Sequence, residues 1–145
     1  MNMNIECVRK IICYCVRNID YEEIGLNEWK EKCISLNMLY DTKDLKGFSK
    51  KDIMYSVMRL NEMEYIKLQN ISPLNKTYIN NCIISDVTYL GHNFYNSIQD
   101  DTVWNKTKSI IAKAGNHTLK FVEDTAQMIA VASAKQAITV MMTQK

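Results

Sequence analysis

Two β-rich runs joined by a turn cluster lie in the middle of a chain whose other segments have helical spacing. In Tyr65–Ile71 and Thr77–Val87, β-branched and aromatic residues recur in the alternating pattern that is typical of strands. Ser72–Lys76 between them contains the only proline of the 145-residue chain, and proline and asparagine favour turns. The sequence therefore predicts one antiparallel β-hairpin.

Three helices are expected before this hairpin, over residues 4–19, from Asn27 to Leu36 and over Lys50–Met63. In each of them, apolar side chains recur at helical spacing. These positions are Ile5, Val8, Ile12, Cys15 and Ile19 in the first helix, Trp29, Cys33 and Leu36 in the second, and Ile53, Val57 and Leu60 in the third. Asn27 and Ser49 supply the side-chain oxygens that cap the second and third helices.

Further helices are expected after the hairpin, over residues 88–97, 102–114 and 119–142. Asp100 and Asp101 favour a helix start, Gly115 favours a helix end, and Trp29 and Trp104 are expected as core anchors. The predicted fold class is mainly α with a small antiparallel β-hairpin. Three helices followed by a hairpin have the order of a winged helix-turn-helix domain, here residues 1–114, and a long C-terminal oligomerisation helix follows at residues 118–145.

Two sequence blocks carry a family resemblance. Gly91-His92-Asn93-Phe94 and Asp100-Asp101-Thr102-Val103-Trp104 resemble the G-H-x-F and D-D-T-V-W blocks of an uncharacterised winged-helix-like family that is common in phages and prophages. Phe48–Ile66 is similar to that family's helix leading into its first wing strand, where the family usually has glycine at the position of Glu64. The resemblance implies a winged-helix fold and a phage or prophage setting, and it brings no catalytic residues.

Residues 42–76, which include the third helix and the first strand of the hairpin, carry a net positive charge. Residues 42–76 contain 7 basic and 4 acidic side chains, whereas residues 77–105 contain no lysine or arginine. Lysines there would contact phosphates, and polar side chains on the exposed side of the helix would face base edges or a protein partner. The candidate DNA-binding or partner-binding residues are Lys43, Lys46, Lys50, Lys51, Tyr55, Ser56, Arg59 and Lys76.

The last helix combines a sector of small side chains with large apolar residues on its other side. Because a helix that is apolar nearly all round is normally buried, it is expected either to pack on its own domain or to pair with the same helix of a second subunit. The second alternative predicts a homodimer. Its candidate dimerisation residues are Leu119, Val122, Ala126, Ile129, Ala130, Ser133, Ala137 and Val140.

The sequence argues against several classes of function. The five cysteines form no C-x-x-C pair, and the phosphate-cradling and hydrolytic motifs are missing, so neither an enzyme nor a metal or other cofactor is expected. The N-terminus does not resemble a signal peptide and the polar residues within Thr125–Met142 argue against a membrane span, so a cytoplasmic protein is expected.

Two functions are compatible with these observations. The first is a phage- or prophage-type winged-helix protein that binds double-stranded DNA in an accessory or transcription-regulatory role. The alternative is a small phage-encoded interaction module that binds and inhibits a host defence protein, because a surface of mixed charge with aromatic residues also suits a protein interface.

Overall fold

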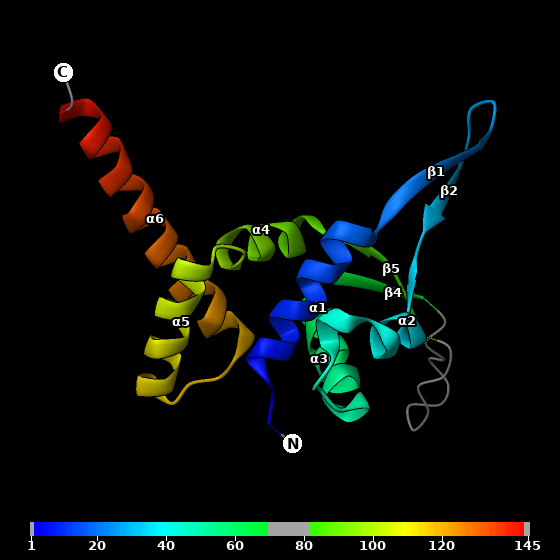
Figure 1. The fold of residues 1–145 in the computed structure, drawn as a ribbon, viewed down its shortest axis with the longest axis horizontal. Helices are drawn as coiled ribbons and strands as arrows, with labels where there is room; N and C mark the ends of the chain where they lie inside the picture. Colours follow the sequence, from blue (N-terminus) through cyan, green and yellow to red (C-terminus); the bar gives the residue numbers. More distant parts are fainter. Residues whose placement is uncertain (1, 70–81, 144–145) are drawn as a thin grey trace. The chain divides into compact units, whose positions relative to one another are not determined.

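Most helices of this chain begin and end near the residues that the sequence predicts from capping side chains and apolar spacing. The computed structural model describes residues 2–69 and 82–143 and is mainly helical, with a small antiparallel sheet and a long C-terminal helix (Figure 1). The predicted fold class is therefore confirmed at this level. The chain divides into two compact units, residues 1–95 and 96–145.

Helices α1 (Ile5–Asn18) and α3 (Lys50–Glu62) contact each other in the first unit. The Asn4 side chain caps α1 by accepting hydrogen bonds from two amides of its first turn. Ser49 caps α3, as predicted, by accepting a hydrogen bond of 3.0 Å from an amide of that helix. The buried apolar residues are Cys7, Val8, Ile11, Ile12 and Cys15 in α1 and Ile53, Val57 and Leu60 in α3.

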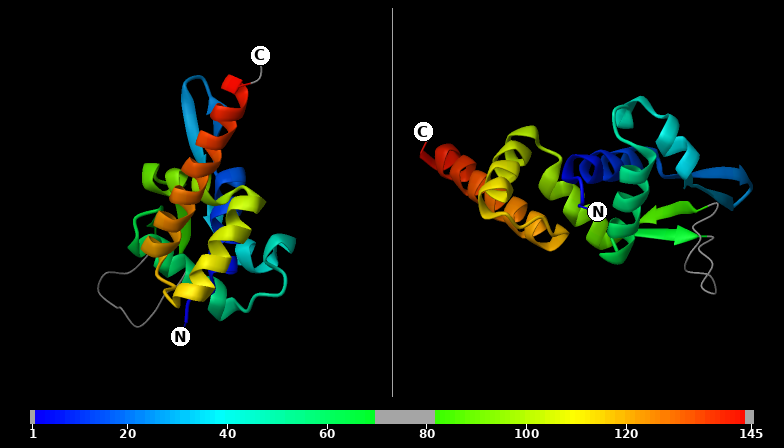
Figure 2. Two further views of the ribbon diagram at one scale, coloured as in Figure 1. Left: turned by 90° about the vertical axis from the view of Figure 1, so that its left-hand side faces the viewer. Right: turned by 90° about the horizontal axis from the view of Figure 1, so that it is seen from below.

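Three short strands form an antiparallel sheet that contacts these two helices (Figure 2). They are β3 (Ile34–Ser35), β4 (Ile66–Gln69) and β5 (Ile83–Val87), in the order β3-β5-β4. The pairing of β4 with β5 confirms the predicted hairpin, in a register that places Ile66 opposite Val87. The predicted turn at Ser72–Lys76 lies outside the described residues.

The expectation of a helix from Asn27 to Leu36 is wrong. The chain instead forms an antiparallel hairpin of β1 (Asp20–Gly25) and β2 (Glu28–Lys32). Its turn holds Asn27 at a φ of 57°, in the left-handed region that asparagine tolerates. Trp29 lies on β2 with 62% of its surface exposed, so it is not a core anchor.

Two short helices lead from this hairpin to α3. Helix α2 (Leu36–Asp41) begins after Ser35, whose hydroxyl accepts a hydrogen bond of 3.2 Å from an amide of the helix. The 3₁₀ turn η1 (Lys43–Leu45) follows, and Gly47 then adopts a φ of 102°. These turns bring the chain back to the start of α3.

Helix α3 ends in a Schellman motif centred on Glu64. The amide of Tyr65 donates to the carbonyl of Leu60 at 3.0 Å, and the amide of Glu64 donates to the carbonyl of Asn61 at 2.9 Å. Glu64 has a φ of 60°, in the left-handed region that glycine occupies with least strain. Glycine, which the resemblance implies at this position, would adopt this backbone with less strain.

Helix α4 (Tyr89–Ile98) approaches the end of α3 at Gly91. A Cβ atom added at this position would overlap the carbonyl oxygen of Tyr65 and lie 2.8 Å from Val87 Cγ1. Because real Cβ contacts are longer than this, the backbone of α4 reaches its place only with glycine at position 91.

Two further contacts fix α4 at the same point. The Thr88 amide donates a 3.0 Å hydrogen bond to the carbonyl of Tyr65, and the Thr88 hydroxyl donates to the carbonyl of Glu64. The ring of Phe94 stacks on the ring of Tyr65 with 4.7 Å between centroids, and both side chains are buried. The end of α3, strand β4 and helix α4 are therefore joined at one place.

The second unit contains α5 (Asp101–Ala114) and α6 (Leu119–Thr143), which contact each other. Asp100 caps α5 by accepting a hydrogen bond of 2.9 Å, and Gly115 ends the helix with a φ of 70°, both as predicted. Trp104 is 2% exposed, which confirms it as a core residue.

Within the chain, helix α6 is buried only near its start. Its buried residues are Leu119, Val122, Thr125 and Ala126. Residues 131–143 are exposed throughout. Among the helices of the described residues, none combines the length and the apolar character needed to cross a bilayer.

The left-handed backbone at position 64 predicts that Glu64→Gly stabilises the protein. Removing the Cβ atom relieves about 1–2 kcal/mol of backbone strain in the folded state. Glycine's greater freedom in the unfolded chain offsets about half of this gain. Urea unfolding is expected to show a free energy of unfolding that is higher by about 0.5–1 kcal/mol. Glu64→Ala is the control because it removes the carboxylate and keeps the Cβ atom. Equal stability of the two variants would contradict the prediction.

The close approach at position 91 predicts that Gly91→Ala destabilises the protein. Backbone has to move away from the new methyl group, which is expected to lower the free energy of unfolding by about 2–3 kcal/mol in the same assay. Gly25→Ala is the matched control, since its nearest neighbour is the flexible Glu28 carboxylate at 3.2 Å. A loss at position 91 no larger than that at position 25 would show that the approach is not a constraint.

Candidate functional site

Four exposed lysines lie in the segment that leads into α3 and in its first turn. Lys43 and Lys46 lie in and just after η1, and Lys50 and Lys51 begin the helix. Amide groups at the start of a helix carry partial positive charge, so lysines placed there add to a potential that attracts anions. We call Lys43, Lys46, Lys50 and Lys51 the lysine cluster.

Neighbouring side chains hold the lysine cluster in place. The Lys50 ammonium lies 5.4 Å from the centre of the Tyr40 ring, close enough for a cation–π attraction. Partial burial raises the pKa of Tyr40. Arg17 of α1 pairs with Asp44 of η1 at 3.3 Å, which links η1 to α1 and offsets the charge of one carboxylate beside the cluster; Asp52, in the first turn of α3, is a second carboxylate next to it.

The side chains expected to face base edges are only partly available. Arg59 pairs with Glu62 at 2.9 Å and lies 5.0 Å from the centre of the Tyr55 ring, so its guanidinium already has partners within α3. Tyr55 and Arg59 are both half-buried.

Two further candidates cannot be placed on this surface. Ser56 is fully buried, so the expectation that it lies on the exposed side of the helix is wrong. Among the described residues its hydroxyl has no hydrogen-bond partner, and burial raises the pKa of the Cys7 thiol. Lys76 lies outside the described residues.

A small cavity of about 170 Å³ lies where α1, β1, β5 and α4 meet. Cys15, Asp20, Asp86 and His92 are among its lining residues. Burial raises the pKa of Cys15 to about 12, so the thiol stays protonated and is a poor nucleophile. Across residues 2–69 and 82–143, no three histidine, cysteine, aspartate or glutamate side chains are grouped to hold a metal ion.

The candidate dimerisation residues divide into two sets along α6. Leu119, Val122 and Ala126 are buried within the chain, so the expectation that they meet a second subunit is wrong. Ile129 and Ala130 are half-buried. The remaining candidates are exposed, namely Ser133, Ala137 and Val140.

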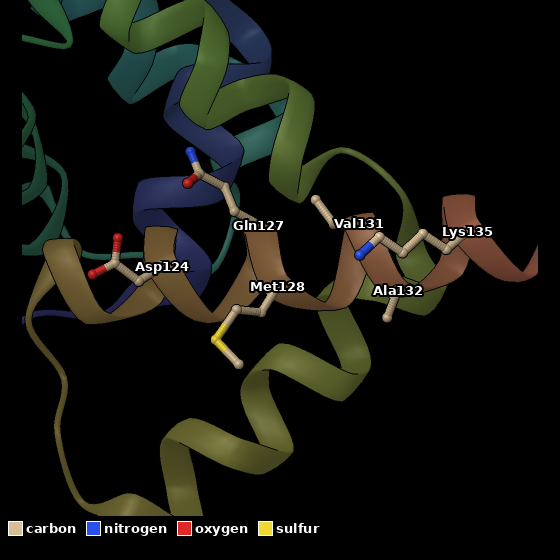
Figure 3. Close-up of a pocket in the computed structure, with 6 residues that line it drawn as sticks. All are labelled: Asp124, Gln127, Met128, Val131, Ala132 and Lys135. Atoms are coloured by element: carbon tan, nitrogen blue, oxygen red, sulfur yellow. The ribbon is translucent and has the colours of Figure 1, made fainter.

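An open groove of about 570 Å³ runs along the middle of α6. Figure 3 shows its lining side chains on successive turns of this one helix. They are Asp124, Gln127, Met128, Val131, Ala132 and Lys135. Because one helix supplies the whole lining, the groove has the character of a helix face suited to another macromolecule more than of a pocket for a small molecule.

The hairpin of β1 and β2 is an exposed surface that the sequence interpretation missed. Its apolar side chains are 56% to 90% exposed. They are Tyr21, Ile24, Leu26 and Trp29. Gly25 and Asn27, which flank Leu26 and favour turns, were the available sequence signal for a hairpin.

Both motif blocks have structural roles. Gly91 permits the approach of α4 to Tyr65, and Phe94 stacks on that residue, while His92 between them is exposed. In the second block, Asp100 caps α5 and Trp104 is buried. Gly91, Phe94, Asp100 and Trp104 therefore support the fold, while His92 lines the small cavity.

Comparison with known proteins gives one match. A family model described as "Hypothetical protein (DUF2513)" matches residues 2–117, which include both motif blocks. Neither a curated protein nor a solved structure matches the chain. Because the match covers most of its length, the chain belongs to the DUF2513 family.

Proposed function

We propose that this protein is a winged-helix protein that binds double-stranded DNA in an accessory or regulatory role. The order of elements supports this proposal: α1, β3, α2, α3, β4 and β5 follow one another as in a winged helix, and the β1–β2 hairpin is an insertion after α1. Helix α3 is then the recognition helix and the β4–β5 pair is the wing. The resemblance of the motif blocks supports a phage or prophage setting, in the cytoplasm and without a cofactor.

The lysine cluster is the observation that carries the proposal. Its four lysines are exposed, and Lys50 and Lys51 lie in the first turn of α3, at the positive end of the helix dipole. Each phosphate that such a group neutralises releases counterions from DNA, which favours binding at low salt. Because Arg59 is paired within α3 and Ser56 is buried, phosphate contacts dominate over base contacts, and sequence preference is weak.

A second candidate function uses the same face of α3. The contacts among Tyr55, Arg59 and Glu62 make a surface of aromatic and paired charged groups, which suits a protein partner such as a host defence protein. This candidate predicts one stoichiometric protein captured from a nuclease-treated host lysate, and loss of that capture with Tyr55→Ala. DNA binding through the lysine cluster would be retained by Tyr55→Ala.

The exposed part of α6 supports a homodimer. Beyond the buried start of the helix, large apolar side chains are 48% to 74% exposed. They are Met128, Val131, Ile138, Val140, Met141 and Met142. Exposed patches of this kind often mark interfaces, and the small residues Ser133 and Ala137 would let a second helix approach closely. Two winged-helix domains would then bind one duplex together.

Binding to a short duplex of arbitrary sequence tests the DNA proposal. Lys50→Ala combined with Lys51→Ala is expected to weaken the complex about tenfold and to reduce the slope of log K against log salt by about 1.8. Gel shifts between about 50 and 200 mM salt measure both quantities. Lys30→Ala combined with Lys32→Ala removes the same charge from β2 and is expected to have little effect. Equal losses in the two double variants, or salt-insensitive binding, would refute the proposal.

The mass in solution tests the dimer. Light scattering is expected to give twice the chain mass of 16.9 kDa. Ala137→Arg places a long charged side chain in the small-residue sector and is expected to give the monomer mass. A monomeric unmodified protein would contradict this part of the proposal.

A further inference from the structure

The β1–β2 hairpin is a well-formed surface that neither the DNA proposal nor the dimer uses. It extends away from the three-stranded sheet of its unit (Figure 1). All its strand residues are exposed except Gly25, which is half-buried. A two-stranded hairpin alone is marginally stable in water, and this one buries neither of its faces within the chain.

The strand register separates the hairpin side chains into two different faces. Residues directly opposite each other share a face, and so do residues two apart along a strand. One face pairs Asp20 with Lys32 and Glu22 with Lys30, so opposite charges lie across from each other. We call the other face the acidic aromatic face; it consists of Tyr21, Glu23, Trp29 and Glu31.

The acidic aromatic face has two carboxylates and no cation. Glu23 lies across from Trp29, and Glu31 lies across from Tyr21, so each carboxylate is beside an aromatic ring. Among the described residues, Glu23 and Glu31 form no ion pair. The two rings are 56% and 62% exposed, so their surfaces are available to a partner.

We propose that the acidic aromatic face binds an arginine-rich segment of a partner protein. A guanidinium group pairs with a carboxylate through two parallel hydrogen bonds and also stacks on an aromatic ring, and this face offers both groups side by side. A lysine ammonium would gain the charge attraction but would lose the planar stacking. Ile24 and Leu26, near the tip of the hairpin, are exposed as well.

Charge excludes the other large classes of partner from this surface. Residues 20–32 contain 5 acidic and 2 basic side chains, although the whole chain has a net charge of +2. Nucleic acid phosphates and anionic lipid headgroups would both be repelled by this excess of carboxylates. The hairpin therefore selects a cationic polypeptide, and the inference does not depend on whether the lysine cluster binds DNA.

A fluorescein-labelled peptide of six Arg–Ser repeats is the probe, and its fluorescence anisotropy with the full chain at physiological salt is the readout. Saturable binding is expected, with at least threefold weaker binding of the Lys–Ser peptide of equal charge. Trp29→Ala is expected to weaken the Arg–Ser complex about fivefold, and Glu23→Gln combined with Glu31→Gln about tenfold. No saturable binding, or equal affinity for both peptides, would overturn the proposal.

The matched control is Glu22→Gln combined with Glu28→Gln, which removes the same charge from the opposite face of the same hairpin. It is expected to weaken binding less than threefold. An equal loss in both double variants would mean that the peptide binds by general charge attraction, which would overturn the proposal. Because these side chains are exposed, each variant is expected to fold, and thermal unfolding checks this. Self-association of the chain that Trp29→Ala abolishes would also overturn the proposal, because the face would then bind a second copy.

Discussion

The backbone of α4 lies so close to the carbonyl oxygen of Tyr65 that a Cβ atom at position 91 would overlap it. That contact joins the end of α3, strand β4 and helix α4, and the stacked rings of Tyr65 and Phe94 fill the space beside it. With its C-terminal end fixed there and its apolar stripe buried, α3 can present its N-terminal lysines from a rigid support. Protein interiors are packed as densely as organic crystals, so a close contact of this kind holds the elements that it joins in fixed relative positions.

The first unit carries surfaces of opposite character. The lysine cluster is basic and adjoins a helix N-terminus, whereas the β1–β2 hairpin is acidic and aromatic. The net charge of +2 conceals this separation because it averages over both. If both proposals hold, the first unit binds an anionic partner at the lysine cluster and a cationic partner at the hairpin.

Strong local signals made most helices predictable from the sequence. Ser49, Asp100 and Gly115 have the capping roles that their residue types favour. The β1–β2 hairpin was missed because Trp29, Cys33 and Leu36 fit a helical period. In the structure, the turn preference of Gly25 and Asn27 outweighs that period.

The site was less predictable than the fold, because residue type and position gave conflicting signals. Ser56 lies three residues after Ile53 and four before Leu60, so its spacing places it in the buried stripe although its hydroxyl suggests the surface. The pairing of Arg59 with Glu62 follows from their spacing on one helix, but the position of Tyr40 beneath Lys50 depends on tertiary packing that no local pattern shows.

An NMR titration of the isotope-labelled chain with a short DNA duplex tests the central claim most directly, since every backbone amide reports its own environment. The account predicts chemical-shift changes concentrated between Lys43 and Lys51, with the amides of the β1–β2 hairpin unchanged. Changes centred on the hairpin, or none at any DNA concentration, would contradict it.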